Sequence, residues 1–166
     1  MRTVPVYIYG NNNGAVKINS SNEVVLSADS QGAAAFQMVE CLASSNVSAT
    51  QRPACFSFMD ATRPGWYVRH SNYFLQVDPI NRTKNLTLFN SDSSFIVYPS
   101  IHKPGSYVLQ SVNYHQHVIS AQADGRLKIV PHQIADFQRA SFTFFAFNAS
   151  STYPQSVCLM ALYKFV

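Results

Sequence analysis

The chain consists of short stretches in which apolar and polar residues alternate, and turns rich in Gly, Asn, Asp, Ser and Pro separate them. Alternation with a period of two is typical of half-buried β-strands. Helical periodicity is nearly absent, and residues 133–142 hold one turn at most. Strands are therefore predicted at roughly 4–9, 15–19, 23–28, 34–40, 55–59, 66–70, 73–78, 94–98, 106–112, 117–121, 126–130 and 141–147.

One motif recurs three times, with small residues preceding a Phe on an alternating strand. It reads "AAFQMV" at 34, "SSFIVY" at 93 and "ASFTFF" at 140, and these copies lie about one third of the chain apart. Phe36, Phe95 and Phe142 are therefore expected at threefold-related positions in a single core. The segment 55–70 also aligns with 106–121 without a gap.

Twelve strands in three groups of four predict an all-β fold, a β-trefoil in which six strands close a barrel and three hairpins cap it. One domain is expected over 1–166. Its repeats are placed at approximately 1–53, 54–104 and 105–166. A thirteenth strand at 156–165 is also predicted, and the pattern leaves open whether it or the N-terminal strand closes the barrel.

Composition agrees with strands and excludes several functions. The 166 residues suit one domain with its own core, and 12% charged against 13% aromatic residues favours strands. The formal charge of +4 comes from scattered Lys and Arg, so nucleic-acid binding is not predicted. No apolar run approaches the roughly 20 residues that span a bilayer, and the first residues show no signal-peptide pattern.

Cysteines and sequons indicate a secreted, extracellular glycoprotein. The three cysteines fit no zinc spacing, so a Cys41–Cys55 disulfide across a short loop is predicted, with Cys158 either free or joined to another chain. Five Asn-x-Ser/Thr sequons are present, and Asn46, Asn81 and Asn85 are taken as glycan acceptors. The remaining two sequons begin at Asn19 and Asn148.

Catalysis and metal binding are not predicted. Glycoside hydrolysis usually requires two carboxylates about 5 to 9.5 Å apart, and the eight acidic residues are spread without a shared motif. His115 and His117 face one side of a strand, but no third ligand lies near them in the sequence. The chain is therefore expected to be a non-enzyme without a cofactor.

The second repeat resembles a known family. "ATRPGWYVRHSNYFLQVD" at 61 and "FNSDSSF" at 89 are similar to the arabinofuranose-binding module of α-L-arabinofuranosidase B, the family 42 carbohydrate-binding module. The resemblance implies a β-trefoil with a shallow pocket in which His70 and Asp92 bind the hydroxyls of a terminal arabinofuranose. Asn72 would add a polar contact, and Tyr73 or Trp66 would cover a sugar ring face.

The other two repeats depart from this pattern. In the third, Ala121 and the vicinity of Arg139 replace the His and the Asp. In the first, Ile18 or Asn19 and the vicinity of Ala34 replace them. One surviving pocket is therefore predicted, with glycans or glycoproteins as partners.

Several alternatives remain open on the sequence alone. His70 also fits a strand histidine, Asp92 a turn-forming Asp, and Trp66 a hairpin cap. Related modules occur in otogelin-type extracellular glycoproteins, so an adhesive trefoil that has lost sugar binding and contacts matrix proteins is the main alternative. A protease inhibitor with 43–54 as its reactive loop is a weaker one.

Overall fold

The computed structural model describes residues 5–29, 31–136, 138–146 and 155–156. Its strands are β1 Val6–Gly10, β2 Ala15–Ile18, β3 Val24–Ser27, β4 Ala35–Glu40, β5 Cys55–Asp60, β6 Trp66–Ser71, β7 Phe74–Pro79, β8 Phe95–Pro99, β9 Tyr107–Ser111, β10 His117–Ala121, β11 Leu127–Pro131, β12 Phe142–Ala146 and β13 Gln155–Ser156. Each of the twelve strands predicted at 4–147 overlaps one of these, so the all-β expectation is confirmed. One α-helix, α1 Leu86–Asp92, lies in the described part of the chain.

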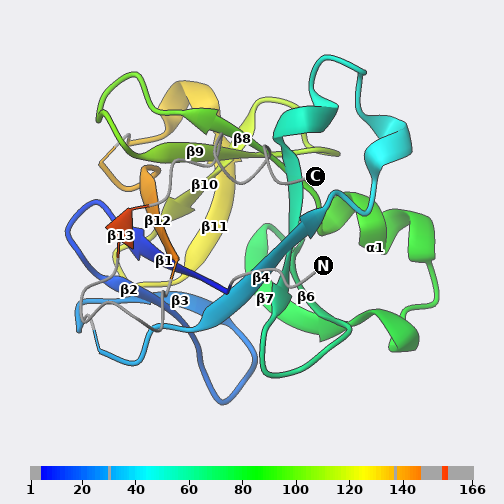
Figure 1. Cartoon of the computed structure of the whole chain (residues 1–166), viewed down its shortest axis with the longest axis horizontal. Helices are drawn as coiled ribbons and strands as arrows, with labels where there is room; N and C mark the ends of the chain where they lie inside the picture. The colour runs from blue at the N-terminus through cyan, green and yellow to red at the C-terminus, as the bar shows by residue number, and fades with distance from the viewer. Residues whose placement is uncertain (1–4, 30, 137, 147–154, 157–166) are drawn as a thin grey trace.

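Strand pairing closes the sheet into a barrel (Figure 1). Antiparallel pairs run from β12 through β9, β10, β11, β7, β6, β5, β4 and β1, and β1 pairs back with β12. A shorter ring, β1–β4–β5–β8–β9–β12, also closes because β8 pairs with both β5 and β9. Closure leaves no exposed sheet edge along this ring.

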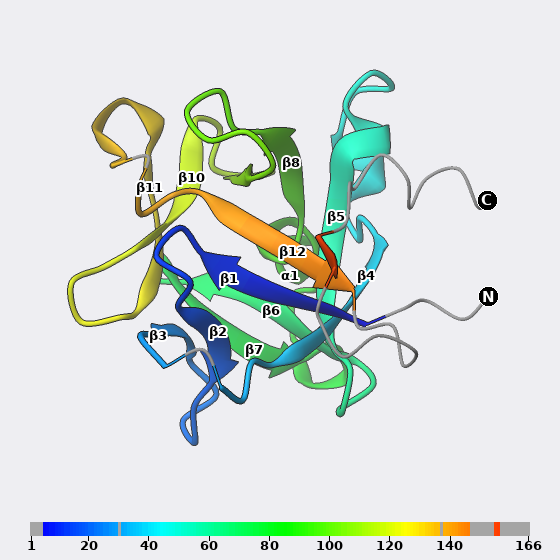
Figure 2. The ribbon, with the colours of Figure 1, turned by 60° about the vertical axis from the view of Figure 1, so that its left-hand side comes forward.

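The N-terminal strand completes the ring. β1 pairs with β12 from Val6↔Ala146 to Gly10↔Phe142, and the two strands lie side by side in both views (Figure 1 and Figure 2). Of the predicted strand at 156–165, only Ser156 belongs to the described residues, in β13, where it pairs with Phe145. The rest of that segment, Cys158 and Asn148 lie outside the described residues.

The hairpins β2–β3, β6–β7 and β10–β11 meet at one end of the barrel. Single bridges connect Glu23 with Gln76, Val25 with Arg126, and Lys128 with Phe74. A network of this kind orients each hairpin against the other two. The turn of β6–β7 is thereby fixed relative to the barrel.

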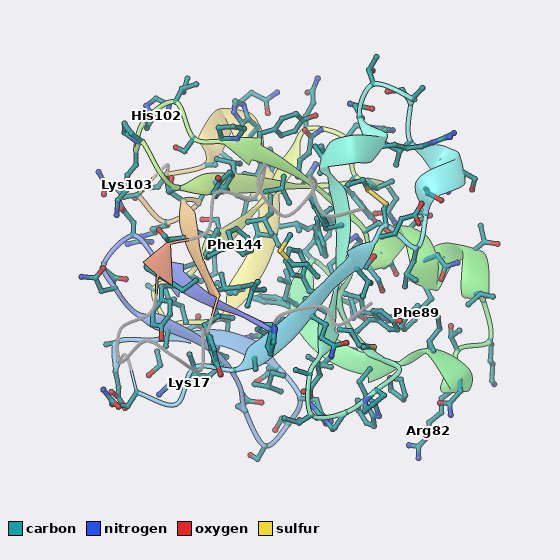
Figure 3. All side chains as sticks on the ribbon, viewed as in Figure 1. Lys17, Arg82, Phe89, His102, Lys103 and Phe144 are labelled. Carbon is teal, nitrogen blue, oxygen red and sulfur yellow. A yellow bond between two sulfur atoms is a disulfide. The ribbon has the colours of Figure 1, made fainter. Side chains whose placement is uncertain are left out.

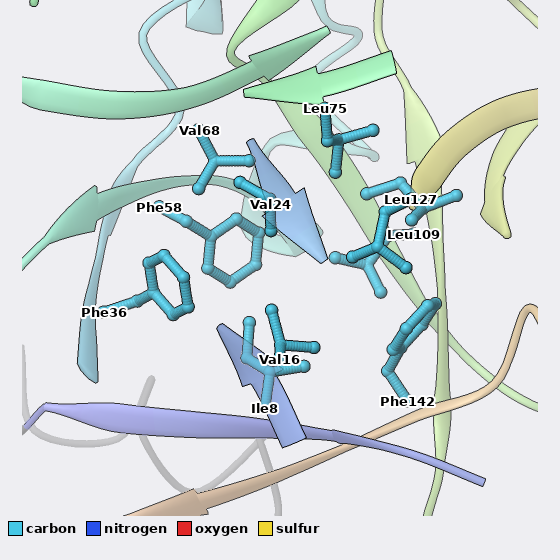
Figure 4. Close-up of a pocket in the computed structure, with 11 residues that line it drawn as sticks. Ile8, Val16, Val24, Phe36, Phe58, Val68, Leu75, Leu109, Leu127 and Phe142 are labelled. Atoms are coloured by element: carbon cyan, nitrogen blue, oxygen red, sulfur yellow. The ribbon is translucent and has the colours of Figure 1, made fainter. Parts of the chain in front are cut away.

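Phe36, Phe95 and Phe142 are buried in one apolar cluster, as the recurring motif predicts. Burying each ring stabilises the fold by roughly 1.5–3 kcal/mol relative to exposure. A cavity of about 30 Å³ lies at the centre (Figure 4). Its lining is apolar: Ile8, Val16, Val24, Phe36, Phe58, Val68, Leu75, Leu109, Ile119, Leu127 and Phe142.

A disulfide joins Cys41 to Cys55, the pair expected from the sequence. β4 and β5 are antiparallel neighbours, and the two Cα atoms lie 5.2 Å apart. Both cysteines are buried in a second, smaller apolar cluster beside the barrel. The segment 43–54 that they enclose contains the 3-10 turns Ser44–Asn46 and Arg52–Ala54.

Helix α1 was not predicted, because seven residues are too few to show a helical period. Its N-cap is Asn85, whose side chain accepts a hydrogen bond from the Leu88 N–H at 3.0 Å. Phe89, labelled in Figure 3, is buried beside α1 and β6. Its ring contacts Tyr67 edge-on at 6.4 Å. This anchor places Asp92, the last residue of α1, beside β6.

Candidate functional site

A polar cluster forms where β6, the end of α1 and the segment after β9 meet. The Asn113 side chain connects His70 with Asp92. Its Oδ1 lies 2.8 Å from His70 Nε2, and its Nδ2 donates to Asp92 Oδ1 at 2.7 Å. His70 Nε2 and Asp92 Oδ1 are themselves 3.5 Å apart. The structure therefore brings together the two residues that the family resemblance singles out.

The hydrogen bonds determine which ring nitrogen of His70 carries its proton. A carboxylate only accepts hydrogen bonds, so the Asn113 NH₂ group must face Asp92. Asn113 Oδ1 then faces His70, and it also accepts from Ser111 Oγ at 3.0 Å. We infer from this network that neutral His70 carries its proton on Nε2.

His70 is almost completely buried, with 3% of its surface exposed. Burial lowers the pKa of its imidazole below 6.5, because the protonated ring would lose hydration. The hydrogen bond to Asn113 and the charge of Asp92 oppose this effect, whereas the charges of Arg69 and His117 add to it. The ring is therefore neutral at neutral pH.

Arg69 holds the opposite side of the Asp92 carboxylate. Its Nη1 lies 3.7 Å from Asp92 Oδ2, and its Nε lies 2.8 Å from Asp78 Oδ2. The guanidinium also lies over the Phe89 ring at 5.6 Å. A negative charge at a helix C-terminus is unfavourable, so Arg69 offsets the cost of placing Asp92 there.

The contacts of Asp92 differ from those of a turn-forming Asp. Within the described residues, its carboxylate accepts a hydrogen bond from Asn113, with His70 and Arg69 close by. No backbone N–H donates to it in this part of the chain. Asp92 therefore serves the polar cluster rather than an Asx-turn.

Two exposed tyrosines and a half-buried histidine, Tyr73, Tyr114 and His117, lie beside this cluster, and we call them the aromatic rim. Tyr114 contacts the buried His70 ring edge-on at 5.2 Å and Tyr73 at 5.4 Å. Tyr73 and His117 are nearly parallel, with centroids 6.3 Å apart. Tyr73 and Tyr114 are 44% and 39% exposed, so their faces are available to a ligand.

The turn between β6 and β7 explains the positions of Asn72 and Tyr73. Both have positive φ, 49° and 69°, between the paired residues Ser71 and Phe74, which is the pattern of a two-residue type I′ hairpin turn. Asn adopts this conformation readily, whereas Tyr does so at an energetic cost. Asn72 is exposed at the turn, and its side chain makes no hydrogen bond to any described residue.

The structure does not bring Trp66 into the cluster. Trp66 is the first residue of β6 and pairs with Pro79, about 13 Å along the strand from His70 at 3.3 Å per residue. It packs against the main core, and the Arg63 guanidinium lies 4.4 Å above its ring. These contacts are those of a hairpin cap.

Ser111, Asn113 and Tyr114 are site residues that the sequence reasoning missed, and it considered His117 only as a metal ligand. They belong to the third repeat and reach the second through the β8–β9 pairing. The gapless alignment of 55–70 with 106–121 held a usable signal, because it places Asp60, Thr62 and Arg63 opposite Ser111, Asn113 and Tyr114. A set of three polar or charged residues therefore recurs at the C-terminal ends of β5 and β9.

The equivalent residues before the β6–β7 hairpin are Asp60, Thr62 and Arg63, and the charges of Asp60 and Arg63 pair with each other. Asp60 Oδ2 accepts from Arg63 Nε at 2.6 Å, and its Oδ1 accepts from the Thr62 hydroxyl at 2.7 Å. Arg63 Nη1 donates to Asn22 Oδ1 at 2.8 Å. Ala121, matched to His70 in the third repeat, carries no side-chain hydrogen-bonding group. In the first repeat the matched position is Ile18, which is apolar, or Asn19, whose amide is engaged with Glu23. The described contacts thus favour a site in the second repeat.

Two other features do not form a polar ligand site. The central cavity of about 30 Å³ is lined by apolar side chains of the core (Figure 4). Among the described residues, no group of three His, Cys, Asp or Glu has a metal-binding arrangement. His117 Nδ1 lies 3.3 Å from the His115 carbonyl oxygen.

Among the residues that the structure describes, no helix is long and apolar enough to cross a membrane.

A closed all-β barrel with a small polar cluster and an aromatic rim is typical of a binding module. The alpha-L-arabinofuranosidase B (ABFB) domain family matches residues 6–145. Because this match covers most of the chain, the protein belongs to that family, whose domain is a carbohydrate-binding module and is not catalytic. No match to a curated protein was found.

Solved structures agree on the fold. A GH54 a-l-arabinofuranosidase soaked with a cyclic sulfate inhibitor has a TM-score of 0.65 at 18% identity, over 87% of this chain and 31% of that one. An arabinofuranosidase complexed with arabinofuranosyl-alpha-1,2-xylobiose has a TM-score of 0.64 at 18% identity, with the same coverages of 87% and 31%. A mosquitocidal holotoxin has a TM-score of 0.63 at 8% identity, over 89% of this chain and 18% of that one. This chain thus spans under a third of the enzymes' length, and the similarity concerns the fold.

Proposed function

We propose that the protein is a non-catalytic carbohydrate-binding module that recognises a terminal furanose, or a similar small sugar, through one site in the second repeat. The observation that carries this proposal is the His70–Asn113–Asp92 network beside the aromatic rim. Sugar recognition requires both kinds of group, since hydroxyls need fixed donors and acceptors and the ring face needs an apolar surface.

The roles divide as follows. Asp92 accepts hydrogen bonds from sugar hydroxyls, and His70 and Asn113 add polar contacts. Tyr73 or Tyr114 covers a ring face, with Asn72 at the edge of the site. Affinity is expected to be weak, on the order of 0.1–1 mM, because few hydrogen bonds are gained beyond those that water already offers.

The three-repeat organisation is part of the proposal. The six-strand ring and the three hairpins that meet through single bridges support a β-trefoil with four strands in each repeat. This fold has three equivalent places for a pocket. The neutralised Asp60–Arg63 pair and the apolar Ala121 at the third-repeat position matched to His70 support the idea that only one of them binds sugar.

Catalysis is not proposed. Asp78 and Asp92 are two carboxylates close to each other, but both lie against Arg69. A glycosidase instead keeps its two carboxylates on either side of an open cleft. The hydrolytic activity in the names of the structural relatives belongs to chains of which this one matches 31%.

An adhesive module without sugar binding is the second candidate, and one observation favours it. His70 and Asp92 are only 3% and 6% exposed, and both are hydrogen-bonded to the Asn113 side chain. Such a network is stable without a ligand. The inhibitor hypothesis loses support, because the 3-10 turns within 43–54 differ from an extended reactive loop.

An extracellular setting fits both candidates. A disulfide is typical of proteins from oxidising compartments, and glycans are then natural partners. The sequons and the low charge support an origin in a secreted glycoprotein, such as one of the otogelin type. Matrix proteins would be the partners of the adhesive alternative.

The test is an NMR titration of the folded chain with arabinofuranosides, galactofuranosides and a mixed glycan panel. We expect shifts around residues 66–73, 89–94 and 111–117 at about ten-millimolar sugar, in keeping with the weak affinity. Asp92→Asn should abolish them, and Asp136→Asn, an exposed Asp in the third repeat, should not. If no sugar shifts these resonances, the adhesive function takes the place of sugar binding.

A further inference from the structure

Two exposed asparagines precede the first residue of α1, on a surface that the proposed sugar site does not use. Asn81 lies in the 3-10 turn Ile80–Arg82, and Asn85 is the N-cap of α1. Each begins an Asn-x-Thr sequon, with Thr83 and Thr87 as the hydroxyl residues. The three other sequons, at Asn19, Asn46 and Asn148, carry Ser in that position.

The side-chain amides of Asn81 and Asn85 are open to modification in the folded protein. Within the described residues Asn81 makes no side-chain hydrogen bond. Asn85 uses its Oδ1 to accept from the Leu88 N–H, which leaves its Nδ2 to solvent. A glycan is attached through Nδ2 and needs a surface position, so the helix cap and the glycan are compatible.

The Ser sequons that the structure describes have occupied amides. Asn19 Nδ2 donates to Glu23 Oε2 at 2.9 Å, and its Oδ1 accepts from the Ser21 and Glu23 N–H groups. Asn46 Nδ2 donates to Ser91 Oγ at 3.2 Å. Ser91 is buried and precedes Asp92, so a glycan on Asn46 Nδ2 would be attached to the same nitrogen that makes a contact at the end of α1.

We propose that Asn81 and Asn85 are N-glycosylation sites and that Asn19 and Asn46 are structural asparagines. The donor is a lipid-pyrophosphate-linked oligosaccharide. The amide nitrogen bonds to the anomeric carbon, the bond from that carbon to the pyrophosphate oxygen breaks, and the lipid pyrophosphate leaves as the amide loses one proton. Asn46, which the sequence predicted as a glycan acceptor, is thus proposed to be structural instead.

Glycans at these positions leave the candidate sugar site open. Asn85 precedes α1 and Asp92 ends it, and seven residues at 1.5 Å each separate them by about 10 Å along the axis. The glycans would therefore lie at the end of the helix remote from His70. This inference does not depend on whether the site binds sugar.

The test is secretion of the full chain, with an added cleavable signal, from a eukaryotic host. Intact mass is measured before and after peptide-N-glycosidase treatment, and the acceptors are mapped by conversion of Asn to ¹⁸O-labelled Asp. We expect one glycan at Asn81 and one at Asn85 in the wild-type chain, and none at Asn19 or Asn46. Thr83→Ala and Thr87→Ala should each remove one, as should Asn81→Gln, which keeps Thr83.

Ser48→Ala is the matched control, because it removes the Asn46 sequon and leaves Asn46 in place. This variant should keep the full wild-type glycan mass. An unmodified Asn81 or Asn85 in the secreted wild-type chain, or a glycan mapped to Asn19 or Asn46, would overturn the assignment. Sugar titration of the treated and untreated chain should give the same shifts.

Discussion

The Asn113 amide lies directly between His70 and Asp92, 2.8 Å from the imidazole Nε2 and 2.7 Å from the carboxylate Oδ1. Asn113 is 43 residues from His70 in the sequence, so closure of the barrel creates this contact. The site is therefore shared between two repeats, and its stability depends on their packing.

Truncation of Asn113 tests this bridge. Asn113→Ala leaves the buried His70 and Asp92 without their common partner, and an unsatisfied buried polar group costs about 1–3 kcal/mol. Urea unfolding at neutral pH should show a loss of that size in the free energy of unfolding. Asn72→Gly is the control, because Gly also adopts positive φ and Asn72 makes no described side-chain hydrogen bond. An equally small effect for both variants would contradict the bridging role.

His70 should make stability depend on pH in the mildly acidic range. Burial lowers its pKa in the folded protein below the ordinary 6.5, so the unfolded chain binds the proton first on acidification. The contribution is complete above pH 6.5 and decreases as the pH falls through the folded pKa. Urea unfolding across this range should show the slope, and His70→Gln should reduce it. An unchanged slope in the variant would assign the effect to other histidines.

Asp60 should make stability depend on pH in a more acidic range than His70 does. Burial raises the pKa of its carboxyl, but hydrogen bonds from Arg63 and Thr62 and the charge of Arg63 outweigh burial and hold it below 3.8. Its stabilisation is present above 3.8, the ordinary pKa of the unfolded chain, and is lost as the pH falls through the lower pKa of the folded protein. Asp60→Asn should flatten the acid-unfolding curve monitored by tryptophan fluorescence. The exposed Asp136→Asn serves as the comparison, and a similar flattening there would argue against the Asp60 cluster.

The disulfide should contribute measurably to stability. Cys41 and Cys55 are 14 residues apart, and closing a loop of that size stabilises a fold by about 3 kcal/mol through the unfolded chain. The Cys41→Ala/Cys55→Ala variant should lose this amount in chemical unfolding. The sugar-induced NMR shifts should persist, because neither cysteine contacts His70 or Asp92. Loss of those shifts in a folded variant would show that the site depends on this loop.

Much of the fold was predictable, because period-two alternation is a local signal. The strands that carry Phe36, Phe95 and Phe142 alternate clearly, and these residues share one core. Helix α1 escaped prediction because its seven residues are stabilised by contacts, the Asn85 cap and the buried Phe89, rather than by a helical pattern.

The site was predictable only where one repeat contains it. His70 and Asp92 follow from a motif in the second repeat, and the structure places them 3.5 Å apart. Asn113 and Tyr114 come from the third repeat, and nothing local in the sequence shows that they reach His70. Trp66 stands four residues before His70 on β6, and strand geometry alone was enough to separate the two.

Tyr114 is predicted to cover the polar cluster, so that a sugar reaches His70 only when this side chain moves. His70 is 3% exposed and Tyr114 packs against its ring at 5.2 Å, whereas Tyr73 contacts Tyr114 rather than His70. Diethylpyrocarbonate acylates neutral imidazole nitrogen, and the network leaves His70 Nδ1 unprotonated. Mass spectrometry should show slow acylation of His70 in the wild-type protein and fast acylation in Tyr114→Ala. Tyr73→Ala, which leaves the cover in place, should stay slow. Equal rates in all three proteins would mean that Tyr114 does not control access, and that the ligand instead rests on the outer face of the aromatic rim.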